Sequence, residues 1–237
     1  MVFVRLAVEG FAAANDAAPN PWFSWKYLQG NWNDITTALT QHINLTWQAV
    51  AIAFVLALPL ALLARRFPKL SGWIIGASGV LYTIPSLALF AVLAPFTGIG
   101  ATTVLIGLVA YALLVLVRNT LVGLQQVDPA IIDAARGMGY GDWQILFRVE
   151  LPNALPTIFA GIRMATVTTV ALTTVGVVVG YGGLGQLLFR GFWADYRAEV
   201  VTATVLCLAL AFAFDLALWL FAKAVTPWTR RREGELA

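Results

Sequence analysis

The sequence predicts an all-α integral membrane protein with about five transmembrane helices. Hydrophobic residues make up 60% of the 237 residues, and charged residues make up only 11%. A soluble domain has about 45–50% apolar and about 25% charged residues, because its surface must be polar. The mean hydropathy of +0.80 shows the same excess of apolar residues. The composition therefore argues against a soluble enzyme, a disordered chain and a nucleic-acid-binding protein.

Five apolar stretches are long enough to cross about 30 Å of hydrocarbon, for which a helix needs about 20 residues. The first stretch stops at Arg65 and the third at Arg118, because a charged side chain is costly in hydrocarbon. The second contains Pro85, which predicts a kink because proline lacks a helical N–H group. The fourth contains Arg163 and the fifth Asp215. In chain order, the predicted spans cover residues 43–64, 73–96, 99–117, 155–180 and 200–222.

The basic residues are divided unequally between the two ends of these spans. An odd number of spans places the two termini on opposite sides of the membrane. One side then holds ten Lys and Arg residues in its turns and tail, whereas the other holds only Arg5, Lys26, Arg190 and Arg197. Because Lys and Arg gather on the cytoplasmic side, the sequence predicts the N-terminus outside and the C-terminus inside.

Three regions follow from these spans. Residues 1–42 mix aromatic and polar side chains, which predicts an extracytoplasmic segment on the outer membrane interface; a sixth, degenerate span is the less favoured alternative. Residues 43–225 form the transmembrane domain, and residues 226–237 form a cytoplasmic tail. The sole histidine, His42, is expected to face solvent at the interface, and the sole cysteine, Cys207, is expected to be buried. One cysteine and one histidine predict neither a disulfide nor a metal site.

The connection between the third and fourth spans, residues 128–152, carries the most specific pattern. Asp128 followed by proline predicts a helix start, because the side chain can accept from a free N–H and proline suits the first helical position. Gly139 ends this helix, Asp142 is expected to cap a second one, and Pro152 to close it. Two short amphipathic helices on the inner face are suited to docking a partner.

The spacing within this block resembles a known motif. It has an acidic residue and two alanines, then three residues, a glycine, nine residues, an aliphatic residue, any residue, and Leu-Pro. This pattern resembles the E-A-A motif of binding-protein-dependent ABC importer permeases, with Asp133 for Glu and Val149 for Ile. The resemblance implies the type I importer permease fold and a block that docks on a cytoplasmic ATPase. The residues that it assigns to ATPase coupling are Asp133, Ala134, Ala135, Gly139, Val149, Leu151 and Pro152. An ordinary amphipathic hairpin at the membrane surface is the alternative.

A second resemblance concerns the solute. The segments 81–88 (LYTIPSLA), 111–114 (YALL), 151–154 (LPNA) and 182–185 (GGLG) resemble those of compatible-solute permeases. The resemblance implies a permease for glycine betaine, choline, carnitine or a similar quaternary amine. Methionine or another small polar solute is the alternative, because methionine-type importers share some of these segments.

The family also implies partners. They are two ABC ATPase subunits, a second copy or paralogue of the permease, and an extracytoplasmic solute-binding protein, all at the bacterial inner membrane. The chain lacks a G-x-x-x-x-G-K-[ST] phosphate loop, so ATP and Mg are expected on the partner ATPase and no cofactor on this chain. No catalytic set is visible, and this chain is not expected to be an enzyme. An intramembrane enzyme or a channel is a remote alternative, since neither needs an ATPase dock.

Arg163 and Asp215 are the ionisable residues well inside the predicted fourth and fifth spans. Each lies eight residues from the cytoplasmic end of its span, which is about 12 Å deep at ~1.5 Å per residue. Opposite charges at equal depth predict an ion pair. Two alternatives remain: Arg163 extends to the headgroups while Asp215 is protonated or hydrogen-bonded, or one of the two faces the solute path.

The candidate path or gate residues are a proline and three glycines. Pro85 predicts either a kink that opens a path or a fixed packing kink. Gly182, Gly183 and Gly185 predict either an outer gate or a turn at the end of the fourth span.

Overall fold

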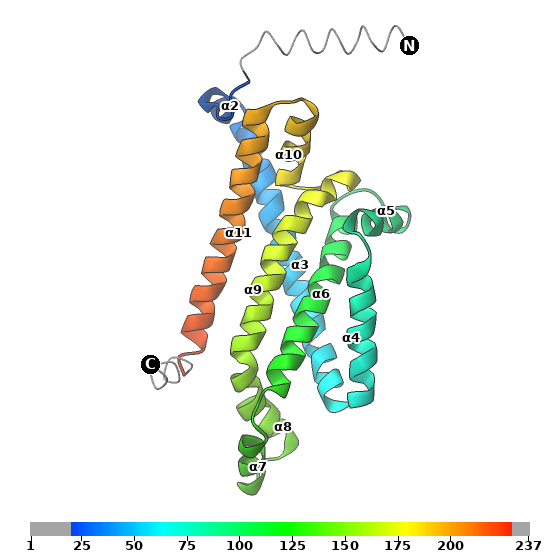
Figure 1. Ribbon diagram of the computed structural model, residues 1–237, viewed down its shortest axis with the longest axis vertical. Helices are drawn as coiled ribbons and strands as arrows, with labels where there is room; N and C mark the ends of the chain where they lie inside the picture. The colour runs from blue at the N-terminus through cyan, green and yellow to red at the C-terminus, as the bar shows by residue number, and fades with distance from the viewer. Residues whose placement is uncertain (1–19, 229–237) are drawn as a thin grey trace.

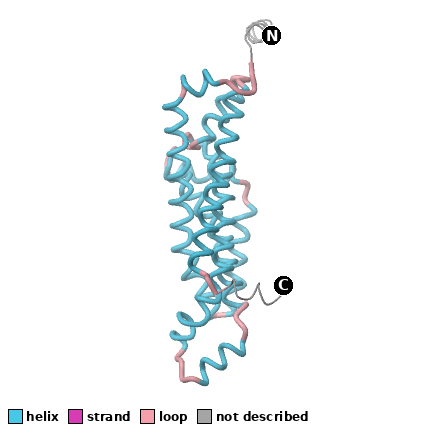
Figure 2. The backbone as a smooth tube through the Cα atoms, turned by 90° about the vertical axis from the view of Figure 1, so that its left-hand side faces the viewer, coloured by secondary structure: helices cyan, strands magenta, loops and turns pink. Residues whose placement is uncertain are grey.

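The computed structural model describes residues 20–228, and every regular element in that range is helical (Figures 1 and 2). The predicted all-α fold is confirmed. Residues 1–19 of the predicted N-terminal segment and residues 229–237 of the predicted tail lie outside the described residues. The elements are α2 (Trp25–Gly30), α3 (Trp32–Arg66), α4 (Pro68–Thr83), α5 (Ser86–Thr97), α6 (Ala101–Gln125), α7 (Pro129–Gly137), α8 (Asp142–Ile145), the π-helical turn η1 (Leu146–Glu150), α9 (Leu151–Val175), the 3₁₀ turn η2 (Gly176–Val179), α10 (Leu184–Trp193) and α11 (Arg197–Val225).

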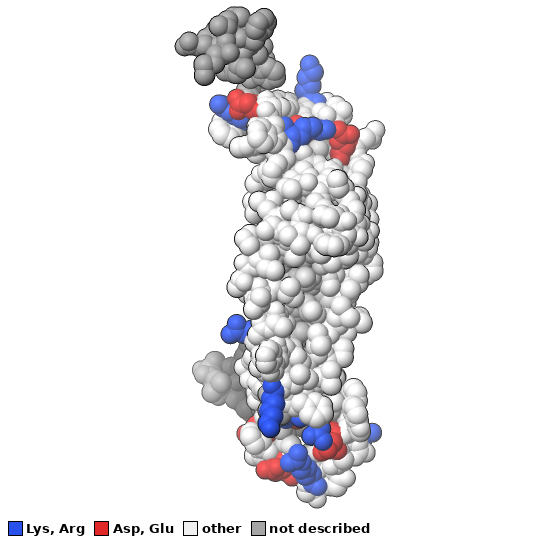
Figure 3. Space-filling view, turned by 90° about the vertical axis from the view of Figure 1, so that its right-hand side faces the viewer, with Lys and Arg blue, Asp and Glu red and all other residues white. Residues whose placement is uncertain are grey.

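Helices α3, α4, α6, α9 and α11 run along the long axis of a bundle (Figure 1). Within the described residues, four helical stretches are long and apolar enough to cross a membrane, or up to five if the bent pair α4–α5 is one span. This range includes the predicted number. Figure 3 shows that charged side chains gather at the two ends of the molecule and leave the middle of the visible face free of them. Such a belt is what contact with hydrocarbon requires.

The core of the bundle lies between α3, α6 and α9. Ala49, Ala53, Ala57 and Ala61 of α3 are fully buried, and their spacing of four places them on one face of the helix. Small side chains let helix backbones approach closely, which is how helices associate where lipid is as apolar as leucine. Gly161 of α9 has the same role, because an added Cβ would lie 2.5 Å from Asn119 Cβ of α6.

Two helices extend beyond the predicted spans. Helix α3 begins at Trp32, eleven residues before the predicted first span, and is unbroken at residue 43. Helix α6 continues past Arg118 to Gln125. Apolar composition marks where hydrocarbon ends, whereas a helix ends only where caps or breakers stop it. The polar residues before residue 43 and the exposed Arg118 contain no breaker, so the helices extend beyond the apolar runs.

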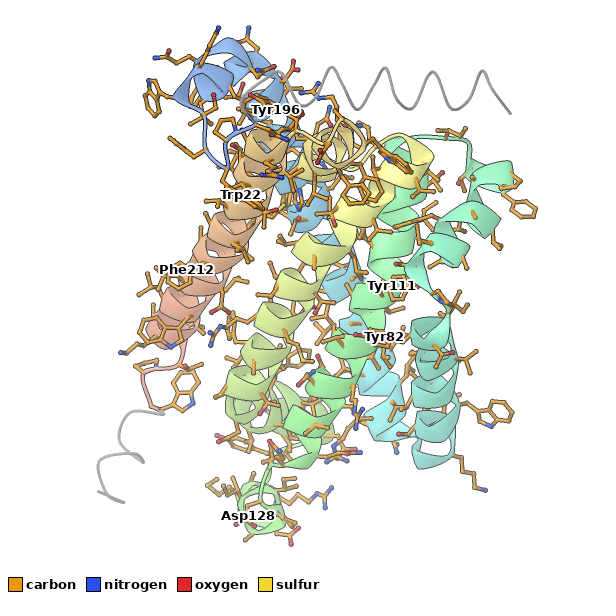
Figure 4. All side chains as sticks on the ribbon, turned by 45° about the horizontal axis from the view of Figure 1, so that its top comes forward. Trp22, Tyr82, Tyr111, Asp128, Tyr196 and Phe212 are labelled. Atoms are coloured by element: carbon orange, nitrogen blue, oxygen red, sulfur yellow. The ribbon has the colours of Figure 1, made fainter. Side chains whose placement is uncertain are left out.

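The predicted second span is two helices and not one kinked helix. Helices α4 and α5 meet at 96°. Ile84, which precedes Pro85, has an extended backbone (φ −67°, ψ 125°), as a residue before proline prefers. The Tyr111 hydroxyl of α6 donates to the Ile84 carbonyl, and the Tyr111 ring packs edge-on against Tyr82, 5.8 Å away (Figure 4). Helix α6 thus satisfies a carbonyl at the break, and α5 turns away from the bundle axis.

Candidate functional site

The 128–152 block projects beyond one end of the bundle, which we call the block end (Figures 1 and 4). Helix α7 begins as predicted, because Asp128 Oδ1 accepts from the Ala130 N–H at 2.8 Å and Pro129 takes the first helical position. The helix is short, and most of its side chains are exposed. Its polar face is therefore available to a partner.

Gly139 ends α7 in a left-handed conformation, with φ +85°. The Tyr140 N–H donates to the Ala135 carbonyl at 3.1 Å, and the Gly139 N–H donates to the Arg136 carbonyl at 2.9 Å. These two bonds form a Schellman motif, which needs a left-handed residue at this position and so favours glycine. An added Cβ on Gly139 would meet no atom within 4 Å. The glycine is therefore required by the backbone and not by packing.

The second half of the block differs from the prediction. Gly141, not Asp142, precedes helix α8, and its N–H donates to Gln144 Oε1 at 3.1 Å. The helix does not end at Pro152 but runs through the π turn η1 into α9. The Leu151 N–H donates to the Leu146 carbonyl five residues earlier. The helix continues through this wider turn although Pro152 has no N–H to donate. Residues Asp142–Val179 thus form one continuous helical stretch.

The predicted coupling residues fall into two groups. Asp133, Ala134 and Gly139 are exposed, and Asp133 lies 3.8 Å from an Arg136 guanidinium nitrogen. Ala135 is buried, and Val149, Leu151 and Pro152 are partly buried. The first group can touch a partner, whereas the second shapes the block.

Three exposed apolar side chains of the block were not singled out by the sequence. Met138, Trp143 and Phe147 are 69%, 72% and 56% exposed, and the two aromatic rings stack with centroids 6.0 Å apart. Large apolar groups that face away from a bundle mark an interaction surface. The available signal was the spacing of four between Trp143 and Phe147, which places both on one helix face.

The structure brings Arg163 and Asp215 together. Arg163 Nε donates to Asp215 Oδ1 at 2.8 Å, and a terminal guanidinium nitrogen donates to Oδ2 at 2.7 Å. This two-bond fork joins α9 to α11 and fixes both side-chain planes. The edge-on contact between Phe159 and Phe221, 5.6 Å apart, joins the same helices nearer the block end. Each charged side chain remains about one third exposed.

The predicted gate glycines lie in a tight turn between η2 and α10 and, for Gly185, in the first turn of α10. Gly183 has φ +54°. A Cβ on Gly182 would lie 2.6 Å from the Val177 backbone nitrogen, and one on Gly185 would collide with the Thr174 backbone. These three positions therefore leave no room for a side chain. Their geometry is that of the predicted turn, and a gating role stays a prediction.

The prediction for His42 is wrong, because its side chain is fully buried. His42 Nδ1 accepts from the Leu184 N–H at 3.3 Å, and Nε2, which then carries the proton, donates to the Val170 carbonyl at 3.0 Å. A Cβ on Gly183 would lie 2.8 Å from His42 Cβ. The imidazole thus ties α3 to α9 and to the glycine turn. The early start of α3 placed His42 inside the packed bundle.

A charged cluster ties the elements at the other end. Arg190 of α10 donates to Glu199 of α11 at 2.6 Å and to Asp34 of α3 at 3.1 Å. Tyr27 lies beside this cluster, and burial together with the Glu199 carboxylate raises the pKa of Tyr27 to about 12. The Tyr27 phenol is therefore neutral at physiological pH and adds no charge to this cluster.

The chain is similar to characterised transport proteins over most of its length. It is 37% identical to the carnitine transport permease protein OpuCB of Listeria monocytogenes over 79% of this chain and 88% of that protein. It is 34% identical to the glycine betaine/carnitine/choline transport system permease protein OpuCD of Bacillus subtilis, over 87% and 90% of the two chains. It is 37% identical to the osmoprotectant import permease protein OsmW of Salmonella typhimurium, over 85% and 96%.

Solved structures share the fold. A chain of the inward-facing MetNI methionine ABC transporter superposes with a TM-score of 0.75 and 26% identity, over 81% of this chain and 96% of that one. A chain of an amino acid ABC transporter superposes with a TM-score of 0.72 at 18% identity, over 85% and 98%. Residues 49–231 match the family described as binding-protein-dependent transport system inner membrane component. The chain therefore belongs to this family of inner-membrane permease components of ABC importers.

Proposed function

We propose that this permease moves a quaternary-amine compatible solute, such as glycine betaine, choline or carnitine, into the cell. The observation that carries the proposal is the 34–37% identity to permeases for such solutes over at least 79% of the chain. The methionine alternative has support from the MetNI superposition, but there the identity is only 26%. We therefore assign the solute class of the relatives with the higher identity, which cover a comparable share of this chain.

Two ATPase subunits bind and hydrolyse ATP with Mg, and each docks on a 128–152 block. Asp133, Ala134, Trp143 and Phe147 present exposed polar and apolar groups to that partner. The continuous helical stretch Asp142–Val179 then carries a displacement of the block into the membrane. A second permease copy or paralogue encloses the path, and an extracytoplasmic binding protein delivers the solute. The cycle is alternating access between outward and inward openings.

The solute is tested with the chain reconstituted in proteoliposomes together with its ATPase and binding protein. Radiolabelled glycine betaine, choline and carnitine are expected to accumulate only when Mg-ATP is present on the ATPase side. Methionine is not expected to accumulate. Uptake of methionine alone would contradict the proposed solute class, and uptake of any solute without ATP would contradict ATP-driven import.

The orientation is tested by cysteine labelling in intact cells, after Cys207→Ser removes the native thiol. A cysteine at the exposed Asn33 is expected to react with an impermeant maleimide added outside. A cysteine at Glu233, in the tail beyond the described residues, is expected to react only after the cells are opened. The reverse pattern would invert the topology, and equal labelling of both positions would indicate an even number of spans.

A further inference from the structure

A partly buried ion pair joins the 128–152 block to helix α3. The Arg65 guanidinium donates to Glu150 Oε1 at 2.7 Å. The Glu150 side chain is 9% exposed and the Arg65 side chain 36%. Among the described residues, Arg65 is the only basic residue within 4.0 Å of the Glu150 carboxylate. A carboxylate this buried needs a charged partner, because desolvation without one is strongly unfavourable.

This pair connects elements that the backbone does not connect. The block continues through the chain into α6 at one end and into α9 at the other. Helix α3 is packed against both α6 and α9, but its last turn leads into α4. Glu150, the last residue of η1, reaches across to Arg65 in that last turn. The pair is therefore a direct electrostatic link from the block to the block end of α3.

The geometry of the link differs from the fork between Arg163 and Asp215. Arg65 makes one hydrogen bond to Glu150, and its buried Nε has no acceptor among the described residues. A pair held by one bond can pivot while it stays in contact, whereas a fork fixes both planes. The pair also stands at the end of a π turn, an element that is frequent at functional sites. These features suit a contact between two elements that move relative to each other, here the block and α3.

We propose that the Arg65–Glu150 pair couples the block to α3, so that α3 moves together with α9 when an ATPase displaces the block. The proposal rests on the proposed function only in assigning the block to an ATPase, and not on the identity of the solute. Without the pair, the block still moves α9 through the continuous helix. Helix α3 then has no direct side-chain link to the block through Arg65.

The test follows each helix separately in the complete transporter with its ATPase. Nitroxide spin labels are placed at Leu63→Cys on α3 and at Met164→Cys on α9, both exposed sites, in a Cys207→Ser background. In the otherwise unaltered chain, Mg-ATP is expected to change the spectrum at both sites. With Glu150→Gln or Arg65→Gln, the change is expected to persist at residue 164 and to be reduced at residue 63, where the packing of α3 against α6 and α9 is then the remaining connection.

The matched control is Arg66→Gln, which removes the neighbouring positive charge, one that carries no ion pair among the described residues. It is expected to leave both responses unchanged. Arg65→Lys keeps a charge-paired contact and is expected to preserve the response of α3, as is the exchanged pair Arg65→Glu with Glu150→Arg. If the exchanged pair does not fold, Arg65→Lys alone makes the distinction.

Uptake of glycine betaine per ATP hydrolysed provides a second readout. Arg65→Gln and Glu150→Gln are expected to lower this ratio by about 3- to 30-fold, while the amount of ATPase that co-purifies stays the same. An α3 response that is undiminished in both variants, or loss of ATPase binding in both, would overturn the link. Absence of glycine betaine uptake in the unaltered chain would contradict the proposed solute instead, because the spin-label responses do not depend on it.

Discussion

Replacing Gly139 with valine is expected to abolish solute uptake while the chain still inserts into the membrane. Gly139 has φ +85°, and an added Cβ would meet no atom within 4 Å. The substitution therefore acts only through the backbone, where an L-residue in the left-handed region costs about 1–2 kcal/mol, and β-branching adds to that cost. Relief of this strain opens the turn between α7 and α8. The exposed groups of the two helices then no longer form one docking surface.

Gly137 provides the matched control. It is the last residue of α7, also has no atom within 4 Å of an added Cβ, and is not in the left-handed region. Gly137→Val is expected to retain uptake, and Gly139→Asn to retain part of it, because asparagine tolerates the left-handed conformation. Uptake, ATP hydrolysis and co-purified ATPase are measured for each variant. Hydrolysis by Gly139→Val that still responds to solute and binding protein would contradict a docking role for this turn.

Removing either partner of the Arg163–Asp215 fork is expected to destabilise the chain in the membrane and to lower uptake. Asp215→Asn leaves a guanidinium, and Arg163→Gln leaves a carboxylate, inside an apolar span. An unpaired charge at the centre of a span costs about 2.5–3.5 kcal/mol on insertion scales. The double variant carries neither charge, so its loss is expected to be smaller than the sum of the single losses.

The measurements are the thermal stability of purified protein, the amount of folded protein in the membrane, and uptake. Thr168→Val is the control, because this exposed hydroxyl on α9 donates only to the Met164 carbonyl of its own helix. It is expected to behave like the unaltered chain. Losses that simply add in the double variant would show that the two charges act independently, and would contradict the pair as a lock between α9 and α11.

The amino-acid sequence by itself determined the membrane class, the approximate spans and the position of the 128–152 block. These features depend on local properties: a run of about 20 apolar residues is long enough to cross the hydrocarbon, and Asp128, Pro129 and Gly139 act on the backbone within one turn. The pairing of Arg163 with Asp215 was accessible for a similar reason. A charge in an apolar span needs a partner, and only few are available at equal depth.

Only the tertiary structure decided which side chains meet across helices. The sequence predicts that His42 is interfacial, but it is buried because α3 packs against α9 and the glycine turn. Pro85 predicts a kink, but the structure has a 96° break between α4 and α5, where Tyr111 of α6 donates to the Ile84 carbonyl. Arg65 and Glu150 are 85 residues apart in the chain. Composition and spacing along the sequence do not contain such distances, because they arise from the helix faces that pack together.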